Sequence, residues 1–225
     1  MSNVVDGKYY EVVPAKSIAE RLLVAARKRI FRDFMARMRP TPLDRILDVG
    51  VSDIVNDGAN VLERSYPHPG SITACGLGEG REFQAAYPAV GYFRIEPNVR
   101  LPFADGSFDI AASNAVLEHV GSVEYQARFV SELCRVARRV FISVPNRYFP
   151  VEHHTALPFV HYADATFRMA CRLSGKSEWM QEESLILMTR ERLRQLAAPI
   201  EKQSTVGYTG LRLGPFSSNL YLAFG

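Results

Sequence analysis

One stretch decides the fold of this chain, residues 101–120, which read LPFADGSFDIAASNAVLEHV. Its segment Ala104-Asp105-Gly106-Ser107 has the composition of a turn. The six residues that follow, 108–113, form a short and mostly apolar run, which is typical of a buried strand. We therefore expect a strand over 108–113 that begins directly after a turn.

Similar apolar runs lie on both sides of this strand and alternate with helical patterns. Strands are expected over 45–50, 72–77, 90–96 and 139–144, and helices over 15–38, 59–64, 81–86, 122–136, 156–173 and 189–196. Ser122 and Thr189 suit the N-cap positions of the helices that they begin. Strands that alternate with helices form βαβ units and a largely parallel sheet. The chain ends with two β-like stretches, 203–208 and 219–224, joined by a loop.

This order predicts an α/β fold of the Rossmann-like, doubly wound kind. Its mostly parallel sheet would have an antiparallel C-terminal edge and would be preceded by an N-terminal helix. No linker or repeat divides the 225 residues, so we expect a single domain over 1–225.

The composition is that of an ordinary globular protein, with 47% hydrophobic and 23% charged residues. No apolar run reaches the roughly 20 residues of a membrane helix. The first six residues lack the apolar stretch of a signal peptide. Together with three widely spaced cysteines, these features predict a cytoplasmic protein without a transmembrane segment.

Basic residues gather between Arg21 and Arg39, where apolar residues recur at helical spacing. Such a cluster can meet phosphates or anionic lipid, or it can be the solvated face of a surface helix. We favour the solvated face and expect no nucleic-acid partner. Docking of this helix on a membrane or a partner stays open, as does the oligomeric state.

The first predicted strand ends in Asp48-Val49-Gly50-Val51-Ser52-Asp53. A dinucleotide site needs G-x-G-x-x-G, because three close backbone approaches accommodate the pyrophosphate. Here Ser52 and Val55 stand at the second and third glycine positions. An acidic strand end with one glycine suits S-adenosylmethionine, which has no phosphate but has a sulfonium, an amino-acid end and a ribose. A plain strand-ending turn would look the same.

The run over 101–120 closely resembles the LPFxDGSFD…LEH signature of class I, S-adenosylmethionine-dependent methyltransferases of the type 11, small-molecule kind. With Ile46 to Gly50, the resemblance covers about residues 44–146. The segment PNRYFPVEHHT over 145–155 resembles a narrower subgroup, PNRxFPxExHT, that is often linked to surface-glycan biosynthesis. The resemblance implies methylation, with O-methylation expected, of a small-molecule or glycan-linked acceptor. The stretch SNAV over 113–116 replaces the N-P-P-Y-like tetrad of enzymes that methylate base amines.

The same resemblance divides the domain and names cofactor residues. It implies a helical extension over 1–42, a cofactor-binding core over 43–146, and an acceptor-side lid with the C-terminal strands over 147–225. Asp48 and Gly50 would line the methionine end of the cofactor, and Asn114 would lie beside the sulfonium. Leu101 would pack near the adenine, and Leu77 is a further candidate contact.

Three positions depart from the family pattern. Ser52 replaces the usual second glycine, and Gly76 takes the place of the carboxylate that holds the ribose hydroxyls. Glu79 is the nearest replacement for that carboxylate. Near the adenine, alignment places Pro97 at an acidic position, with Glu96 one step away. These departures leave an alternative, a non-catalytic binding protein with a methyltransferase fold and a degenerate cofactor site.

Transfer to a hydroxyl requires alignment of the acceptor and removal of its proton. The loop after the fifth predicted strand offers Glu152, His153, His154 and His161. We expect His154 to be the general base, because imidazole titrates near neutral pH, and Glu152 to orient it or to contact the substrate. Alternatively, these groups only fix their own loop. A third ligand at helical spacing is missing, so we expect no metal.

Overall fold

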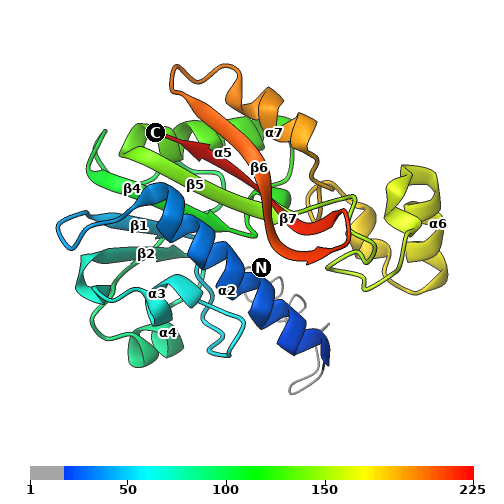
Figure 1. Cartoon of the computed structure of the whole chain (residues 1–225), viewed down its shortest axis with the longest axis horizontal. Helices are drawn as coiled ribbons and strands as arrows, with labels where there is room; N and C mark the ends of the chain where they lie inside the picture. The colour runs from blue at the N-terminus through cyan, green and yellow to red at the C-terminus, as the bar shows by residue number, and fades with distance from the viewer. Residues whose placement is uncertain (1–17) are drawn as a thin grey trace.

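The computed structural model describes residues 18–225. At its centre lies a seven-stranded sheet in the order β3-β2-β1-β4-β5-β7-β6 (Figure 1). The strands are β1 (Ile46–Val49), β2 (Ile72–Gly76), β3 (Gly91–Arg94), β4 (Phe108–Asn114), β5 (Ala137–Pro145), β6 (Ser204–Leu213) and β7 (Phe216–Phe224). Strands β1 to β5 pair in parallel, and β7 runs antiparallel to β5 and β6. The predicted fold class is confirmed.

Helices cover both faces of the sheet. They are α2 (Ile18–Met38), α3 (Val61–Ser65), α4 (Arg81–Ala86), α5 (Val123–Val136) and α7 (Arg190–Ala197), while α6 (Asp164–Leu173) lies to one side of the sheet (Figure 1). The predicted caps of α5 and α7 are confirmed, because the hydroxyls of Ser122 and Thr189 accept hydrogen bonds from the backbone three residues on. The first three residues of the predicted N-terminal helix, 15–17, lie outside the described part of the chain.

The core has two layers because neighbouring strand residues point to opposite faces. In β5, Val140 and Ile142 pack with α5 and α7, while Phe141 packs with α2 on the other face. Phe34 of α2 meets the ring of Phe141 edge-on, with centroids 5.8 Å apart. This packing fixes α2 across the face of the sheet (Figure 1).

Two sequence predictions about the C-terminal third are wrong. Residues 156–163 do not form an α-helix: Val151 and Pro158 form an isolated bridge, Phe159 has a positive φ of 60°, a single 3-10 turn covers Val160–Tyr162, and the α-helix begins only at Asp164. The final strands are longer than predicted and form a tight hairpin instead of flanking a loop. Polar residues of this hairpin, among them Ser217 and Ser218, are buried and hydrogen-bonded, so no apolar pattern reveals them.

The carboxyl ends of the parallel strands meet at one edge of the sheet. Strand β1 lies between β2 and β4, so the chain direction of the crossovers reverses beside β1. Ligands of doubly wound sheets bind at this switch point. Within residues 18–225, no helix has the length and apolar character of a membrane span.

Candidate functional site

Two cavities lie at this edge of the sheet. The larger has a volume of about 520 Å³ and the smaller about 120 Å³. Gly50, Val51, Ala115 and His119 line both, so the cavities adjoin. Together they give an elongated site with two ends.

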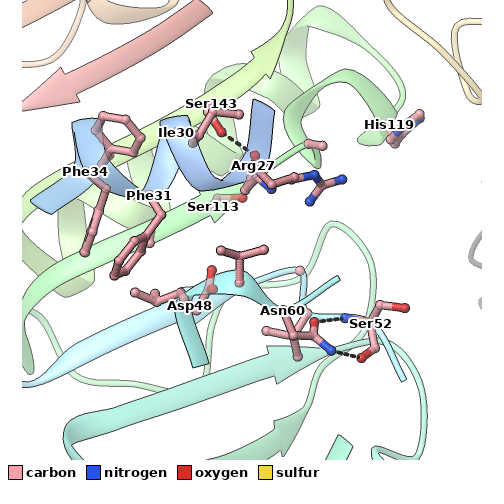
Figure 2. A pocket seen from close by; sticks show the side chains of 18 residues that line it. Arg27, Ile30, Phe31, Phe34, Asp48, Ser52, Asn60, Ser113, His119 and Ser143 are labelled. Atoms are coloured by element: carbon pink, nitrogen blue, oxygen red, sulfur yellow. Dashed lines mark hydrogen bonds between the residues drawn. The ribbon is translucent and has the colours of Figure 1, made fainter. Parts of the chain in front are cut away.

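The structure brings most of the predicted cofactor residues to these cavities. The larger cavity is lined by Gly50, Gly76, Leu77, Glu96 and Leu101. The smaller cavity lies between α2 and the sheet, and its lining includes Asp48, Gly50, Ser52 and Asn114 (Figure 2). Residues separated in sequence meet here because each follows the end of a parallel strand.

Glu79 is the exception among the predicted cofactor residues. It lines neither cavity, and 60% of its side chain is exposed. Its carboxylate pairs with the guanidinium of Arg94, which also lies 4.0 Å from the carboxylate of Glu96. Glu96, in contrast, is the acidic residue at the β3 end of the larger cavity.

Gly50 stands where a side chain does not fit. Its φ is +101°, and a Cβ built on it would lie 2.1 Å from Cγ2 of Val116. The backbone at the end of β1 therefore approaches the segment after β4 more closely than any other residue type allows.

A side chain at position 76 is also excluded by its neighbours. A Cβ there would lie 2.7 Å from the hydroxyl oxygen of Tyr92 and 3.0 Å from the carbonyl oxygen of Val51. The Tyr92 hydroxyl donates a hydrogen bond to the carbonyl of Gly78, at 2.7 Å. The side chain of Tyr92, which comes from β3, thus occupies the space that a side chain at position 76 would need.

The loop after β1 holds its shape without further glycines. The Asn60 side chain accepts from the Ser52 backbone N–H at 3.0 Å and donates to the Ser52 carbonyl at 2.8 Å (Figure 2). The Asp53 carboxylate accepts from the backbone N–H groups of Gly80 and Phe83 at 3.1 and 3.0 Å, which ties the loop to α4. Ser52 is therefore part of an ordered loop, and sequence reasoning missed the role of Asn60.

Asp48 faces a second buried carboxyl, that of Glu63 in α3. Burial raises the pKa of Asp48 to about 6, although the hydrogen bond with Glu63 and the charge of Arg27 lower it. Burial and the charge of Asp48 raise the pKa of Glu63 well above its usual range. The pair therefore holds one proton at neutral pH, on Glu63, and Asp48 carries the negative charge.

Arg27 corrects the prediction that the basic residues of the first helix form its solvated face. Only 8% of this residue is exposed, and its side chain reaches from α2 across the smaller cavity (Figure 2). The spacing of Arg27 with Ile30 and Phe34, both buried, places it on the apolar stripe of the helix. The position of an arginine on the apolar stripe of the helix was the sequence signal that could have predicted its burial.

The predicted catalytic pair, Glu152 and His154, is in contact. The Glu152 carboxylate accepts from the Nδ1–H of His154 at 2.7 Å, from the backbone N–H groups of His154 and Thr155, and from the Thr155 hydroxyl. Burial acts to raise the pKa of Glu152, but the His154 imidazole and these hydrogen bonds outweigh burial and hold it well below its usual range.

His154 does not reach either cavity. Its Nε2 lies 3.2 Å from Nε2 of His119, and it is His119 that lines both cavities. The ring of Trp179 packs on His154 and His119, with centroids 5.1 and 6.2 Å away. His154 and Glu152 instead line a third and much smaller cavity of about 10 Å³, and the role of His154 as a base stays a prediction.

Residues 75–140 match the family model of the type 11 methyltransferase domain. This segment of the chain is therefore similar to a methyltransferase domain. The predicted enzyme class and its methyl donor, S-adenosylmethionine, are thereby confirmed. No curated protein matches the chain in sequence.

Solved structures of methyltransferases share the fold of this domain. Magnesium protoporphyrin IX methyltransferase from Synechocystis, with S-adenosylhomocysteine bound, has a TM-score of 0.63 at 12% identity, over 99% of this chain and 94% of that one. A putative methyltransferase from Haloferax volcanii, in complex with its activator Trm112, has a TM-score of 0.60 at 12% identity, over 98% and 96%. An Aquifex aeolicus methyltransferase dependent on S-adenosylmethionine has 0.59 at 12%, over 97% of each chain.

The departures from the family pattern leave the methyltransferase site open. The larger cavity persists beside Gly76, and the loop that carries Ser52 is ordered by Asn60. The smaller cavity offers both signs of charge, from Arg27 and Asp48. The two ends of the site therefore differ in size and in the charged residues that line them, Arg27 and Asp48 in the smaller cavity and Glu96, Arg100, Arg128 and Glu132 in the larger.

Proposed function

We propose that this methyltransferase domain transfers a methyl group from S-adenosylmethionine to a hydroxyl group of a small, glycan-type acceptor. The observation that carries the proposal is the pair of adjoining cavities, whose chemistry matches the two ends of the donor. The larger cavity suits an adenosine, and the charged smaller cavity suits an amino acid.

In this proposal the methionine end lies in the smaller cavity. The Arg27 guanidinium would hold the carboxylate, since a buried charge needs an opposite charge beside it. Asp48, ionised while Glu63 keeps the shared proton, would hold the ammonium group. The absent side chain of Gly50 would let the donor pass between the two cavities.

The adenosine end lies in the larger cavity. Leu101 and Leu77 would pack on the adenine and ribose, and Glu96 would accept hydrogen bonds from them. Glu79 would take no direct part, because its carboxylate is engaged by Arg94 outside the cavity. The other carboxylate that lines this cavity, Glu132, is paired with Arg135, so Glu96 would make the ribose contact without the usual acidic residue of the family, and that contact would be weaker.

Bound S-adenosylmethionine supplies a methyl group on a positively charged sulfur, which needs no further activation. The protein must align the acceptor and accept its proton. Asn114 is fixed at the end of β4, where its side-chain oxygen accepts a hydrogen bond from Ser143, and it would border the sulfonium. The acceptor would approach from the His119 side, where the 145–155 segment resembles the glycan-linked subgroup.

The test is methyl transfer from isotope-labelled S-adenosylmethionine to a panel of free sugars, nucleotide sugars and oligosaccharides, with amines and carboxylic acids as comparison acceptors. We expect label in a methyl ether, which resists the mild alkali that cleaves methyl esters. The Asp48→Ala variant is the control for dependence on the site. Label found only on nitrogen or carbon, or equally with the variant, would overturn the proposal.

A further inference from the structure

Three side chains from two distant segments meet beside the residues that line both cavities. Glu118 and His119 belong to the 3-10 turn Leu117–His119 after β4, and His154 belongs to the loop after β5. One ligand atom from each lies within 4.8 Å of the other two. We propose that Glu118, His119 and His154 bind a divalent transition-metal ion, of which Zn²⁺ is the best match.

The ring of His119 is oriented for this purpose by a backbone carbonyl. Its Nδ1 lies 2.6 Å from the carbonyl oxygen of Ser184. A carbonyl only accepts, so Nδ1 carries the proton, and Nε2 presents its lone pair. A second hydrogen bond, from the backbone N–H of Ile186 to the Glu118 carbonyl at 2.8 Å, fixes the turn against this strand-like segment.

The ring of His154 is oriented in the same way by a carboxylate. Glu152 receives hydrogen bonds from two backbone N–H groups and one hydroxyl, which keeps it ionised, so Nδ1 of His154 donates to it. Because Nδ1 faces Glu152, Nε2 is the nitrogen that His154 would offer to a metal ion. A carboxylate or a carbonyl behind each histidine is the usual outer support of a metal-bound imidazole.

The Nε2 atoms of His119 and His154 lie 3.2 Å apart. Two nitrogens bound to one tetrahedral Zn²⁺, each at about 2.0–2.1 Å, are about 3.3 Å apart. The observed separation thus matches two ligands of a common ion. Two ring nitrogens at this distance hold either a proton or a cation between them, and the ring of Trp179 packs on both histidines.

Glu118 decides between a shared proton and a metal ion. Only 1% of this residue is exposed, and neither carboxylate oxygen has a hydrogen-bond partner among residues 18–225. Arg27 acts on it through its charge without hydrogen-bonding to it. A proton between His119 and His154 would leave the carboxylate oxygens unsatisfied, whereas a divalent ion satisfies all three groups.

A site with two histidines and one carboxylate leaves a coordination position for water or substrate. His119 lines both cavities, so the ion would lie next to the site of transfer. This role rests on the proposed function. A hydroxyl acceptor bound to the ion loses its proton more readily, which would promote O-methylation. The expectation from sequence that no metal binds considered only the histidines and the glutamate of the loop after β5, and Glu118 and His119 lie outside that loop.

The test measures metal content directly. The full chain is stripped with a chelator, dialysed against Zn²⁺, Mn²⁺ or Mg²⁺, and analysed by elemental mass spectrometry and calorimetry. We expect one Zn²⁺ per chain and no tight Mg²⁺ binding. Glu118→Gln and His154→Asn should weaken Zn²⁺ binding about 10- to 100-fold or more. His153→Asn, a change at the adjacent histidine, is the matched control and should bind like the wild type.

Circular dichroism of each variant shows whether it is folded, and Co²⁺ absorption of the wild type reports the coordination geometry independently of any variant. Absence of stoichiometric Zn²⁺ in the folded wild type, or equal binding by all variants, would overturn the inference. The outcome is separable from the proposed function. If the wild type methylates hydroxyls but binds no Zn²⁺, only the metal site is refuted. If it binds Zn²⁺ but methylates no hydroxyl, only the proposed function is refuted.

Discussion

Replacement of Gly50 by alanine tests the geometry where the two cavities meet. The new Cβ would lie 2.1 Å from Cγ2 of Val116, on a backbone with φ of +101°. The strained backbone costs about 1–3 kcal/mol, and forcing Val116 aside costs about 1–3 kcal/mol more. We therefore expect a loss of unfolding free energy of about 2–6 kcal/mol.

The same change should weaken cofactor binding. Val116 lines the larger cavity, so its displacement narrows the passage between the two ends of the site. A loss of only about 1.4 kcal/mol is a tenfold change in the dissociation constant. We expect S-adenosylhomocysteine to bind at least about tenfold more weakly to the folded Gly50→Ala protein.

Gly106→Ala is the matched control. Gly106 also has a positive φ, +64°, but nothing lies within 4 Å of a Cβ built there. Backbone strain alone predicts a loss of about 1–2 kcal/mol and unchanged cofactor affinity. Urea unfolding and calorimetry measure both quantities. Equal destabilisation of the two variants, with cofactor affinity retained in both, would refute the steric reasoning at Gly50.

Three further predictions concern charged residues. Arg27→Met should weaken the binding of S-adenosylhomocysteine about tenfold or more but leave the binding of adenosine unchanged. Arg29→Met, on the exposed face of the helix, should change neither affinity. Calorimetry measures both, and an equal loss of affinity for the two ligands would contradict the role of Arg27. Glu96→Ala should weaken the same ligand by a larger factor than Glu79→Ala, and the reverse order would restore Glu79 as the ribose carboxylate. Glu63→Gln removes a carboxyl whose pKa is raised in the folded state, and such a group loses its stabilising contribution as pH rises through that pKa. The wild type should therefore lose more unfolding free energy than Glu63→Gln as the pH rises above the usual pKa of a glutamate, and parallel pH profiles would contradict the buried pair.

The sheet was predictable because its strands are short apolar runs between turn signals. The turn at Gly106 and the cap at Ser122 are local features, and both occur in the structure as expected. Residues 156–163 escaped prediction because the polar loop around Glu152 organises them, through a contact between Val151 and Pro158 that has no local pattern.

The residues of the candidate site also fall into those that local sequence patterns predict and those that only the folded chain brings together. Residues next to strand ends, such as Gly50 and Asn114, were predictable because the carboxyl ends of parallel strands must meet. Arg27 comes from a helix outside the matched core, and its burial depends on how α2 crosses the sheet. The contact between His119 and His154 joins residues 35 positions apart, which only the folded chain brings together.

The most direct test of the central claim is calorimetric titration with S-adenosylmethionine and S-adenosylhomocysteine, with NAD as the control. A donor that occupies both cavities predicts micromolar binding of both adenosyl compounds, about −8 kcal/mol, and no binding of NAD. Binding of NAD, or of neither adenosyl compound by the folded protein, would contradict the account.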